Sequence, residues 1–594
     1  MNSSRLKNEG WLYWLAFLLA LGFRFIQLGA SPLADSEANL ALQALHVAQG
    51  RSPLLDPQPA YILFTSILFA VIESTNFMAR FVPALVGSTL VFVPYFFREQ
   101  IHPRPALILA FLLAFDPGLV ALSRQAGGTI LAVTFLLFAW GMWINRRAIP
   151  AGIFAGLALL SGPSVWAGIL ILALTWLFKQ GMQSRTTTME ASIVNRKSEI
   201  ENQKTSISNS LFTNYELPNT ELRPAFIALL VTLLFGGTLF FLSPNGLSAW
   251  LSSLPEYLTG WVSPSVLVPG RMLLVFFAYE PLGIFMAALA IVRGYRTKSR
   301  QLTRLTLWLG VSLLLAIFYR QPAELVWIVI PLLTLAALEL SRSMNVRPEE
   351  RVEVGVVVMA VLILLIYIWF NISNIAVNPY AQIPAVMPIF GEVQNPRYII
   401  LYGASAILIV CLMMVGFGWS PRTARLGAAW SFTIFFSLYS LAAAWGASGL
   451  RNSTGVELWS TDPKPLHTDL LVASVNDISE FSLGHIYSQP VTIVGIDSPA
   501  LEWVLRHREV ELASVLDPQV APPLVITPPM EDLDLPSAYR GQDFTWRQTP
   551  LWNQIQNPDW WSWLVYRQLP RENETIISWA RDDLFPDARE NSAP

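Results

Sequence analysis

Two carboxylates follow the first long apolar segment of this 594-residue chain. Asp35 and Glu37 open a segment with apolar residues at positions 40, 42, 45 and 47, a spacing that predicts a helix. Acids in the first turn of a helix are stabilised by its dipole, which is one sufficient explanation for both. Either acid could instead be a general base acting on an acceptor hydroxyl, or the pair could hold a divalent cation through its oxygens. The spacing alone leaves all three roles open.

Four arginines near the ends of apolar segments could bind an anion. Phosphate is held best by charge-assisted hydrogen bonds, and a guanidinium group can donate two of them in parallel. Each arginine could equally extend its charge to lipid headgroups or pair with a nearby acid. The candidates are Arg80, Arg124, Arg271 and Arg320. As a group they predict a phosphate-binding site.

Two further acids lie in or beside apolar segments. Glu280 follows Arg271 by nine residues, which in a continuous helix predicts a depth of roughly 13–14 Å at about 1.5 Å per residue. An ionisable group at that depth is costly and therefore a candidate site acid, although it could equally be protonated or bonded to a neighbouring helix. Glu324 follows Arg320 by four residues, where an ion pair is the simpler interpretation, but Pro322 disfavours a continuous helix.

The composition restricts the class of protein that positions these groups. Hydrophobic residues make up 53% of the chain and charged residues 13%, about half the 25% or so of ordinary soluble domains. The mean hydropathy is +0.46. The net charge of −2, with no basic domain, excludes a nucleic-acid partner. No histidine spacing resembles a metal site, and Cys411 alone cannot form an internal disulfide. A polytopic membrane protein is predicted.

The apolar runs predict a membrane domain over residues 1–446 with about thirteen transmembrane helices, since one span needs roughly 20 apolar residues. The predicted spans lie near 11–28, 80–97, 105–123, 128–145, 148–161, 164–179, 224–243, 271–292, 305–319, 323–341, 353–371, 397–418 and 426–446.

Basic residues predict how these spans are oriented. Arg5 and Lys7 precede the first span, and five basic residues lie between 293 and 304. Because such residues collect on the cytoplasmic side, the N-terminus is predicted to be cytoplasmic. Residues 29–79 then form a first outer loop, with an interfacial or re-entrant helix at 60–72, and residues 181–222 form a mobile, polar cytoplasmic loop. All four candidate arginines fall near the outer ends of spans.

Residues 447–594 are predicted to form a small extracytoplasmic α/β domain. Strands are predicted at 492–496 and 523–527, and helices at 477–486 and 498–506, capped by Asp477 and Ser498. The later part is rich in tryptophan. These rings could stack on acceptor sugars, but a place in the core or at the membrane interface is favoured. They are Trp546, Trp552, Trp560, Trp561, Trp563 and Trp579.

Several motifs of the chain are similar to those of one class of membrane enzymes. Arg24-Phe-x-x-Leu28, followed by Pro32-Leu33, the two acids and Gly50, resembles the first outer loop of the GT-C membrane glycosyltransferases. More narrowly, the chain resembles the flippase-activity-associated membrane protein family, relatives of the protein O-mannosyltransferases. The other matching segments are Asp56-Pro57, Ala79 to Gly87, Ser123-Arg124, Ala278 to Leu282, Tyr319 to Pro331, Leu501 to Arg506 and Trp561 to Arg567.

The resemblance implies a GT-C-like fold and an inverting sugar transfer from a polyprenyl-phosphate donor. The acceptor would be a glycan or protein, and the reaction would occur on the outer face of the plasma (inner) membrane. The family's catalytic Asp-Glu pair aligns with Ser36-Glu37, with Asp35 one residue earlier, so Glu37 or Asp35 would be the base. Arg271 and Arg320 would be the main ligands of the donor phosphate.

Three positions depart from the family pattern, the first being Ser36, which stands where the family has Asp. Thr129 stands where the family has a second acid, and the family's Glu-Lys before a later tryptophan is replaced by Glu324-Leu-Val-Trp327. These departures favour an alternative, a catalytically decayed subunit that binds lipid-linked glycan and assists flipping or assembly. A secondary transporter would instead show internal repeats, and no repeat is evident. Transfer is the favoured function of the two.

Overall fold

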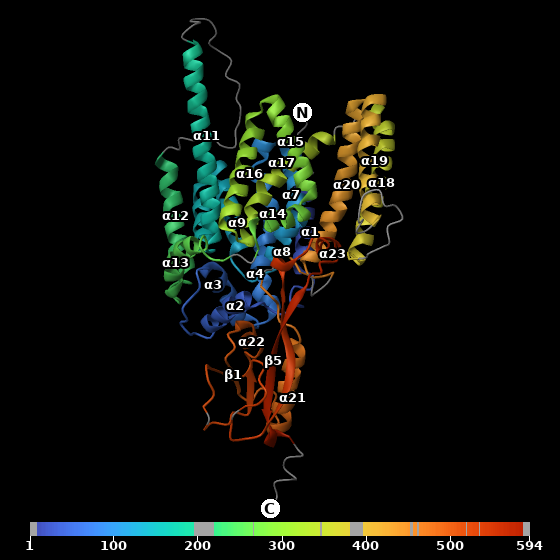
Figure 1. Cartoon of the computed structure of the whole chain (residues 1–594). Coiled ribbons are helices and arrows are strands. Elements are labelled where there is room, and N and C mark those ends of the chain that lie inside the picture. The colour runs from blue at the N-terminus through green and yellow to red at the C-terminus, as the bar shows by residue number, and fades with distance from the viewer. Residues whose placement is uncertain are drawn as a thin grey trace, which may run out of the picture.

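The computed structural model describes residues 9–585 except for 195–218, 265–266, 345–346, 381–395, 452–455, 460–461, 518 and 534. Most of the chain up to Ala447 is helical, and a sheet domain follows. The fold class predicted from the sequence, a polytopic helical membrane protein with a small C-terminal α/β domain, is confirmed. Figure 1 shows the helices as one bundle with the sheet domain at one end.

Six helical segments among the described residues are long and apolar enough to cross a membrane. They are α4 with η2 and α5 (Asn76–Phe96), α16 (Arg300–Tyr319), η3 with α17 (Pro322–Ser343), α18 (Arg351–Val377), α19 (from Arg397 to Gly418) and α20 (Pro421–Ala447). Two bent helix pairs raise the number to eight. The remaining predicted spans correspond to shorter apolar helices, so the predicted number of about thirteen full spans is not confirmed. These are α1 (Gly10–Phe25), α9 (Thr129–Ile144), α10 (Ala148–Leu159), the first part of α11 (Ser164–Val194) and α12 (Asn219–Gly237).

Two predicted straight spans are broken in the structure. A bend of 55° separates α7 (Pro103–Phe115) from α8 (Pro117–Ser123), and a bend of 93° separates α14 (Pro269–Tyr279) from α15 (Pro281–Thr297). At each break an acid precedes a proline, which lacks the amide hydrogen that would continue the helix. The sequence-based depth of Glu280 assumed a continuous helix from Arg271 and is therefore wrong.

The predicted outer loop carries two helices, α2 (Asp35–Ala48) and α3 (Pro59–Val71). They lie with α13 (Asn245–Thr259) at the end of the bundle that carries the sheet domain (Figure 1). The described start of the chain and the connection between α15 and α16 lie at the opposite end. The predicted polar loop at 181–222 is helical as far as Val194, where α11 ends, and α12 begins at Asn219. Residues 195–218 of that loop lie outside the described residues.

The C-terminal domain is a five-stranded mixed sheet in the order β2-β1-β3-β5-β4. The central strands β1 (Val491–Val494) and β3 (Leu524–Thr527) are buried throughout and correspond to the two predicted strands. β1 is parallel to β2 (Val510–Ala513) and to β3. β5 (Arg571–Arg581) is antiparallel to β3 and to β4 (Tyr539–Pro550). Their pairing extends as far as Pro550 and Arg571, so this long hairpin reaches from the sheet to the helical bundle (Figure 1).

Three short helices complete this domain: α21 (Thr468–Leu483), α22 (Pro499–Val504) and α23 (Asp559–Tyr566). The predicted cap at Asp477 is wrong, because α21 begins nine residues earlier, at Thr468. Ser498 does occupy the N-cap position of α22, although its side chain makes no capping hydrogen bond there. Among the tryptophans, Trp546, Trp552, Trp563 and Trp579 are buried, as the favoured interpretation predicted.

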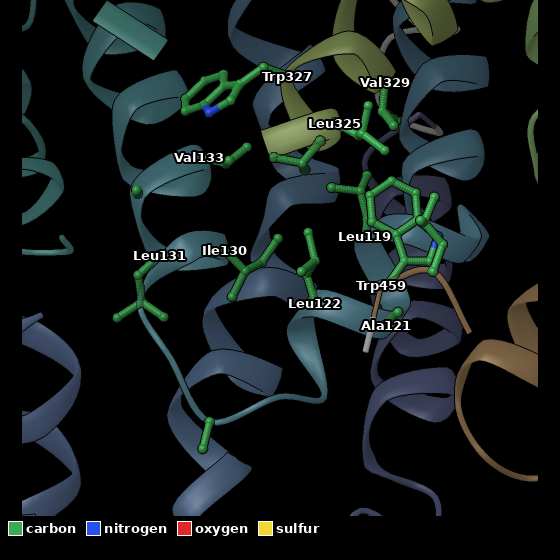
Figure 2. Close-up of a cluster of buried hydrophobic side chains, with 14 of the residues drawn as sticks. Leu119, Ala121, Leu122, Ile130, Leu131, Val133, Leu325, Trp327, Val329 and Trp459 are labelled. Atoms are coloured by element: carbon green, nitrogen blue, oxygen red, sulfur yellow. The ribbon is translucent and has the colours of Figure 1, made fainter. Parts of the chain in front are cut away.

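Trp459 joins the segment after α20 to the membrane domain. Its indole ring lies against α8 beside Leu119 and Ala121, within the same apolar core as Trp327 (Figure 2). A methyl group added at Gly118 would lie 2.5 Å from the ring, so only glycine permits this contact. Residues 456–459 are thereby fixed against the helices rather than against the sheet alone.

Candidate functional site

A polar pocket lies where the membrane domain meets the C-terminal domain. It has a volume of about 100 Å³, and its walls are the ends of α4, α8 and α20, residues 456–457 and 462–466, and the hairpin of β4 and β5. Four basic and two acidic side chains line it: Arg80, Arg124, Lys464, Arg571, Glu457 and Asp462. The pocket therefore concentrates positive charge at the boundary between the two domains.

Arg80 is held in this wall by Glu37. The Nε atom of Arg80 donates to Oε1 of Glu37 at 2.8 Å, and its Nη2 atom donates to Oε2 at 2.6 Å. The same two oxygens accept from the backbone N–H groups of Ala126 (2.8 Å) and Ala34 (3.1 Å). Burial favours a raised pKa for Glu37, but the charge and hydrogen bonds of Arg80 outweigh it and hold that pKa below its usual range. Glu37 is an ionised acid whose acceptor positions are filled.

Arg124 connects the pocket to the first helix. Its Nη1 atom donates to the carbonyl oxygens of Phe23, Arg24 and Ile26, and its Nη2 atom donates to that of Gln27. These carbonyls belong to the end of α1, which has no intrahelical donors for them. Arg124 thus closes the C-terminus of α1 while its guanidinium group also lines the pocket.

Lys464 supplies a positive charge that the other pocket residues do not neutralise. Its ammonium group forms no hydrogen bond or ion pair with the residues that the structure describes. Burial and the nearby charges of Arg80 and Arg124 lower its pKa to about 8, against the opposing effect of Glu37 and Glu457. A bound anion would raise the pKa of Lys464 and stabilise its protonated form, because an opposite charge favours the charged state.

Glu457 lines the same pocket as Lys464. Its Oε2 atom accepts a short hydrogen bond from the Tyr279 hydroxyl, and its Oε1 atom lies 3.5 Å from Nε of Arg567. Burial raises the pKa of Glu457, and the charge of Arg567 and the Tyr279 hydrogen bond lower it only in part. The pKa of Glu37 is therefore lowered from its usual value, whereas the pKa of Glu457 is raised.

Asp35 connects the first outer loop to the C-terminal domain. Its Oδ1 atom accepts from the Ser498 hydroxyl at 2.6 Å and from the backbone N–H of Ala500 at 3.1 Å. Its Oδ2 atom is ion-paired with Arg547, which is also paired with Glu574 on β5. The carboxylate of Asp35 thus occupies the N-terminus of α22, where the Ser498 side chain does not cap the helix.

The other predicted site residues lie away from this pocket. Arg271 donates to the carbonyl oxygen of Trp552, and Arg320 is exposed at the left-handed C-cap of α16. Glu324 is buried and accepts from the Ser164 hydroxyl and the Trp327 indole. Glu280, at the bend between α14 and α15, and Asp116, at the bend between α7 and α8, are both buried.

The described part of the chain shows no side-chain grouping suited to a metal ion. Within the described ranges, no group of three or more His, Cys, Asp or Glu side chains could hold a metal ion. Asp35 and Glu37 are each paired with an arginine, which does not fit a divalent cation bound between them.

Four charged pocket residues were missed in the sequence: Lys464, Asp462, Glu457 and Arg571. A signal for the first two existed, because Asp462-Pro-Lys-Pro465 places opposite charges beside prolines, 16 residues after the end of the last predicted span at 446. Glu457 and Arg571 carry no local signal, since residues distant in sequence bring them to the pocket.

We expect an Asp35→Asn substitution to loosen the C-terminal domain. It removes the negative charge facing Arg547 and weakens the hydrogen bonds to α22, at a cost of about 1–2 kcal/mol for a partly exposed charged group. Amide hydrogen exchange across Pro499–Val504 should become faster, whereas exchange in β1 should not. Asp469→Asn, on α21, is the matched control. Unchanged exchange in α22 would contradict this role.

Comparisons with known proteins give likenesses of fold. No family model matches the sequence, and no curated protein matches it. Among solved structures, the chain is similar to ArnT from Cupriavidus metallidurans bound to undecaprenyl phosphate, with 14% identity over 88% of this chain and 94% of that one, at a TM-score of 0.49. It is also similar to the archaeal oligosaccharyltransferase AglB from Archaeoglobus fulgidus in complex with an inhibitory peptide and a dolichol-phosphate. That likeness has 13% identity over 86% of this chain and 65% of that one, at a TM-score of 0.42.

Proposed function

We propose that this chain is a membrane glycosyltransferase that moves a sugar from a polyprenyl-phosphate donor to a hydroxyl acceptor. The observation that carries the proposal is the pocket between the membrane domain and the C-terminal domain, in which Lys464, Arg124, Arg571 and Arg80 converge. A lipid phosphate has its charge at the membrane surface and its chain in the bilayer. A cationic pocket at the end of a helical bundle suits that combination.

The charge balance of the pocket supports a phosphate ligand. The positive charge of Arg80 is already balanced by Glu37, whereas the ammonium group of Lys464 has no ion-pair partner among the described residues, and burial together with the charges of Arg80 and Arg124 lowers its pKa. When a sugar leaves a phosphodiester, the departing phosphate gains negative charge, and fixed cations stabilise that charge in the transition state. We assign Lys464, Arg124 and Arg571 as phosphate ligands and Arg80 as a residue that shapes the wall. Arg271 and Arg320 do not line the pocket and have no part in this assignment.

An apolar groove beside the pocket suits the donor's lipid chain. It runs between α14, α19 and α23 and is lined by aliphatic and aromatic side chains, among them Leu274, Tyr398, Tyr402, Trp560 and Trp561. Trp563 also lines it, and its ring lies 5.8 Å from that of Tyr279, whose hydroxyl bonds to Glu457. A lipid chain in this groove would therefore enter the bilayer from the side of the pocket where Glu457 lies.

The orientation is part of the same proposal. We place the C-terminal domain outside the plasma (inner) membrane, because the α15–α16 connection, which carries five basic residues between 293 and 304, lies at the other end of the bundle (Figure 1). Acceptor and donor would then meet on the outer face. A cysteine at an exposed position of the sheet domain should react with an impermeant thiol reagent in intact cells.

A second candidate function has one observation in its favour. Both acids predicted as the base are engaged, Glu37 by Arg80 and Asp35 by Arg547. A subunit that binds lipid-linked glycan without transferring it would need the cationic pocket and no base. The two functions are separated by turnover, since both predict binding of a polyprenyl phosphate.

The deciding experiment uses the purified full chain in lipid nanodiscs. Binding of a polyprenyl phosphate is measured first, and transfer from radiolabelled polyprenyl-phosphate sugars to a serine- and threonine-containing peptide and to an oligosaccharide is measured second. Binding with turnover supports the transferase, and binding without turnover supports the second function. Absence of binding would reject both. Lys298→Met, on the opposite end of the bundle, is the matched control for Lys464→Met.

A further inference from the structure

A sugar transfer to a hydroxyl group needs a base for the hydroxyl proton, and neither Glu37 nor Asp35, the two acids predicted for this role, is free to act as one. Glu37 accepts four hydrogen bonds, two of them from Arg80. A proton could reach it only by breaking a buried ion pair, which is costly. Asp35 does not line the pocket and is bonded to Ser498, Ala500 and Arg547. Both acids therefore serve to hold other groups in place.

Glu457 has the position that these two acids lack. It lines the pocket with Lys464, and its side chain is nine-tenths buried. Its Oε1 atom faces Gly446, another lining residue, and a methyl group there would lie 3.5 Å from that oxygen. This oxygen accepts no hydrogen bond among the described residues, and its ion-pair partner, Nε of Arg567, lies 3.5 Å away, whereas the other oxygen is bonded to Tyr279.

The surrounding contacts hold Glu457 in one orientation. Its neighbour Val456 donates to the backbone oxygen of Arg567 at 3.0 Å and accepts from the Trp563 indole at 3.0 Å. The Arg567 guanidinium group lies 4.6 Å from the ring centre of Tyr279 and 4.5 Å from that of Trp563. A base must be fixed within reach of the proton it takes. Asp462, the other acid of the pocket, has no bonded partner among the described residues.

We infer that Glu457, rather than Asp35 or Glu37, is the carboxylate that takes the acceptor proton, an inference that rests on the proposed function. The acceptor oxygen forms a bond to the anomeric carbon of the donor while the bond from that carbon to the phosphate oxygen breaks. The electron pair of the broken bond stays on the phosphate, whose added charge faces Lys464. The acceptor proton moves to Oε1 of Glu457, so atoms and charges balance without a further reactant.

The electrostatic surroundings match this role. Burial raises the pKa of Glu457, so its carboxylate is a stronger base than an exposed one, and the charge of Arg567 opposes that rise. The charged or titratable groups around it come from α14, α20, α23 and the segments 449–451 and 456–466. They are Tyr279, Tyr439, Arg567, Arg451 and Lys464. Because the base must be deprotonated, turnover should fall as pH decreases through the raised pKa of Glu457.

The test compares Glu457→Gln with wild type and with Glu502→Gln, a glutamate of α22 outside the pocket. We expect Glu457→Gln to lower the turnover number at least about 100-fold, the usual effect of losing a general base, and to remove the acidic limb of its pH profile. Affinity for a polyprenyl phosphate should stay within threefold, which also shows that the variant is folded. Glu502→Gln should behave as wild type.

Other outcomes overturn the inference. If the turnover number of Glu457→Gln stays within threefold of wild type, Glu457 is not the base. If the variant loses affinity for the phosphate lipid, Glu457 instead stabilises the fold or the phosphate site. If Asp462→Asn or Asp35→Asn abolishes turnover and the acidic limb while Glu457→Gln does not, another acid is the base. Failure of the proposed function is distinct, because wild type itself then binds or transfers nothing.

Discussion

Replacing Glu37 by leucine is expected to lower the free energy of unfolding by about 3–5 kcal/mol, because it leaves the Arg80 charge buried and unpaired. The side chains of both partners are almost inaccessible to solvent, at 6% and 2% exposure. The measurement is equilibrium unfolding of the purified protein in mixed detergent micelles. Arg80→Met should cost a similar amount, and the double variant should cost less than the sum of the two, since neither charge is then unpaired.

The same pair predicts how stability depends on pH. The pKa of Glu37 is lower in the folded chain than in the unfolded one, so the ionised form stabilises the fold. That stabilisation is complete above the unfolded pKa of about 4.3 and is lost as pH falls through the lower, folded value. In Glu37→Leu the acidic loss of stability should be smaller than in wild type. If the double variant lost as much free energy of unfolding as the two single variants together, a direct interaction between Glu37 and Arg80 would be contradicted.

Replacing Lys464 by methionine is expected to weaken binding of a polyprenyl phosphate by about 10- to 100-fold. A hydrogen bond to a charged group contributes about 1.5–3 kcal/mol, and each 1.4 kcal/mol or so is tenfold in affinity. Isothermal titration of the chain in nanodiscs with the phosphate lipid gives the two affinities directly. Lys298→Met, which removes a positive charge at the C-cap of α15, should leave affinity unchanged.

The pKa of Lys464 gives this prediction a second readout. With a pKa of about 8, its ammonium group loses the proton as pH rises above that value, and the attraction to phosphate is lost with it. Affinity in wild type should therefore decline between pH 7 and pH 9, and the decline should be absent in Lys464→Met. An equal decline in both proteins would show that another cation titrates.

The helices and the two central strands could be predicted because their signals are local. Apolar runs and turn residues mark them, and each predicted span is matched by a described helix. The bends at Asp116 and Glu280 carried a signal too, an acid followed by proline, but the length of the apolar runs suggested straight spans. β4 and β5 were not predicted, because β4 is exposed at residues 540–543 and β5 at residues 572–574, and neither stretch has an apolar alternation.

The candidate site was predicted only in part, for a physical reason. Arg80 and Arg124 carry the local signal of a cation at the end of an apolar run, and both line the pocket. The partners that decide the state of an acid are distant in sequence: Arg80 is 43 residues from Glu37, and Arg547 is 512 residues from Asp35. Lys464 and Glu457 enter the pocket because Trp459 fixes their segment against α8, a contact that no single segment reveals.

The long hairpin of β4 and β5 has a consequence for how the protein matures. Gln548 and Arg571, which line the pocket, lie near the end of the chain, long after the last membrane helix has been synthesised. A chain that ends after α20 would contain every predicted span but would lack both the residues from 456 to 466 that line the pocket and the hairpin. Membrane insertion and completion of the pocket are therefore separate events in time, and the cell can hold inserted copies whose pocket is not yet complete.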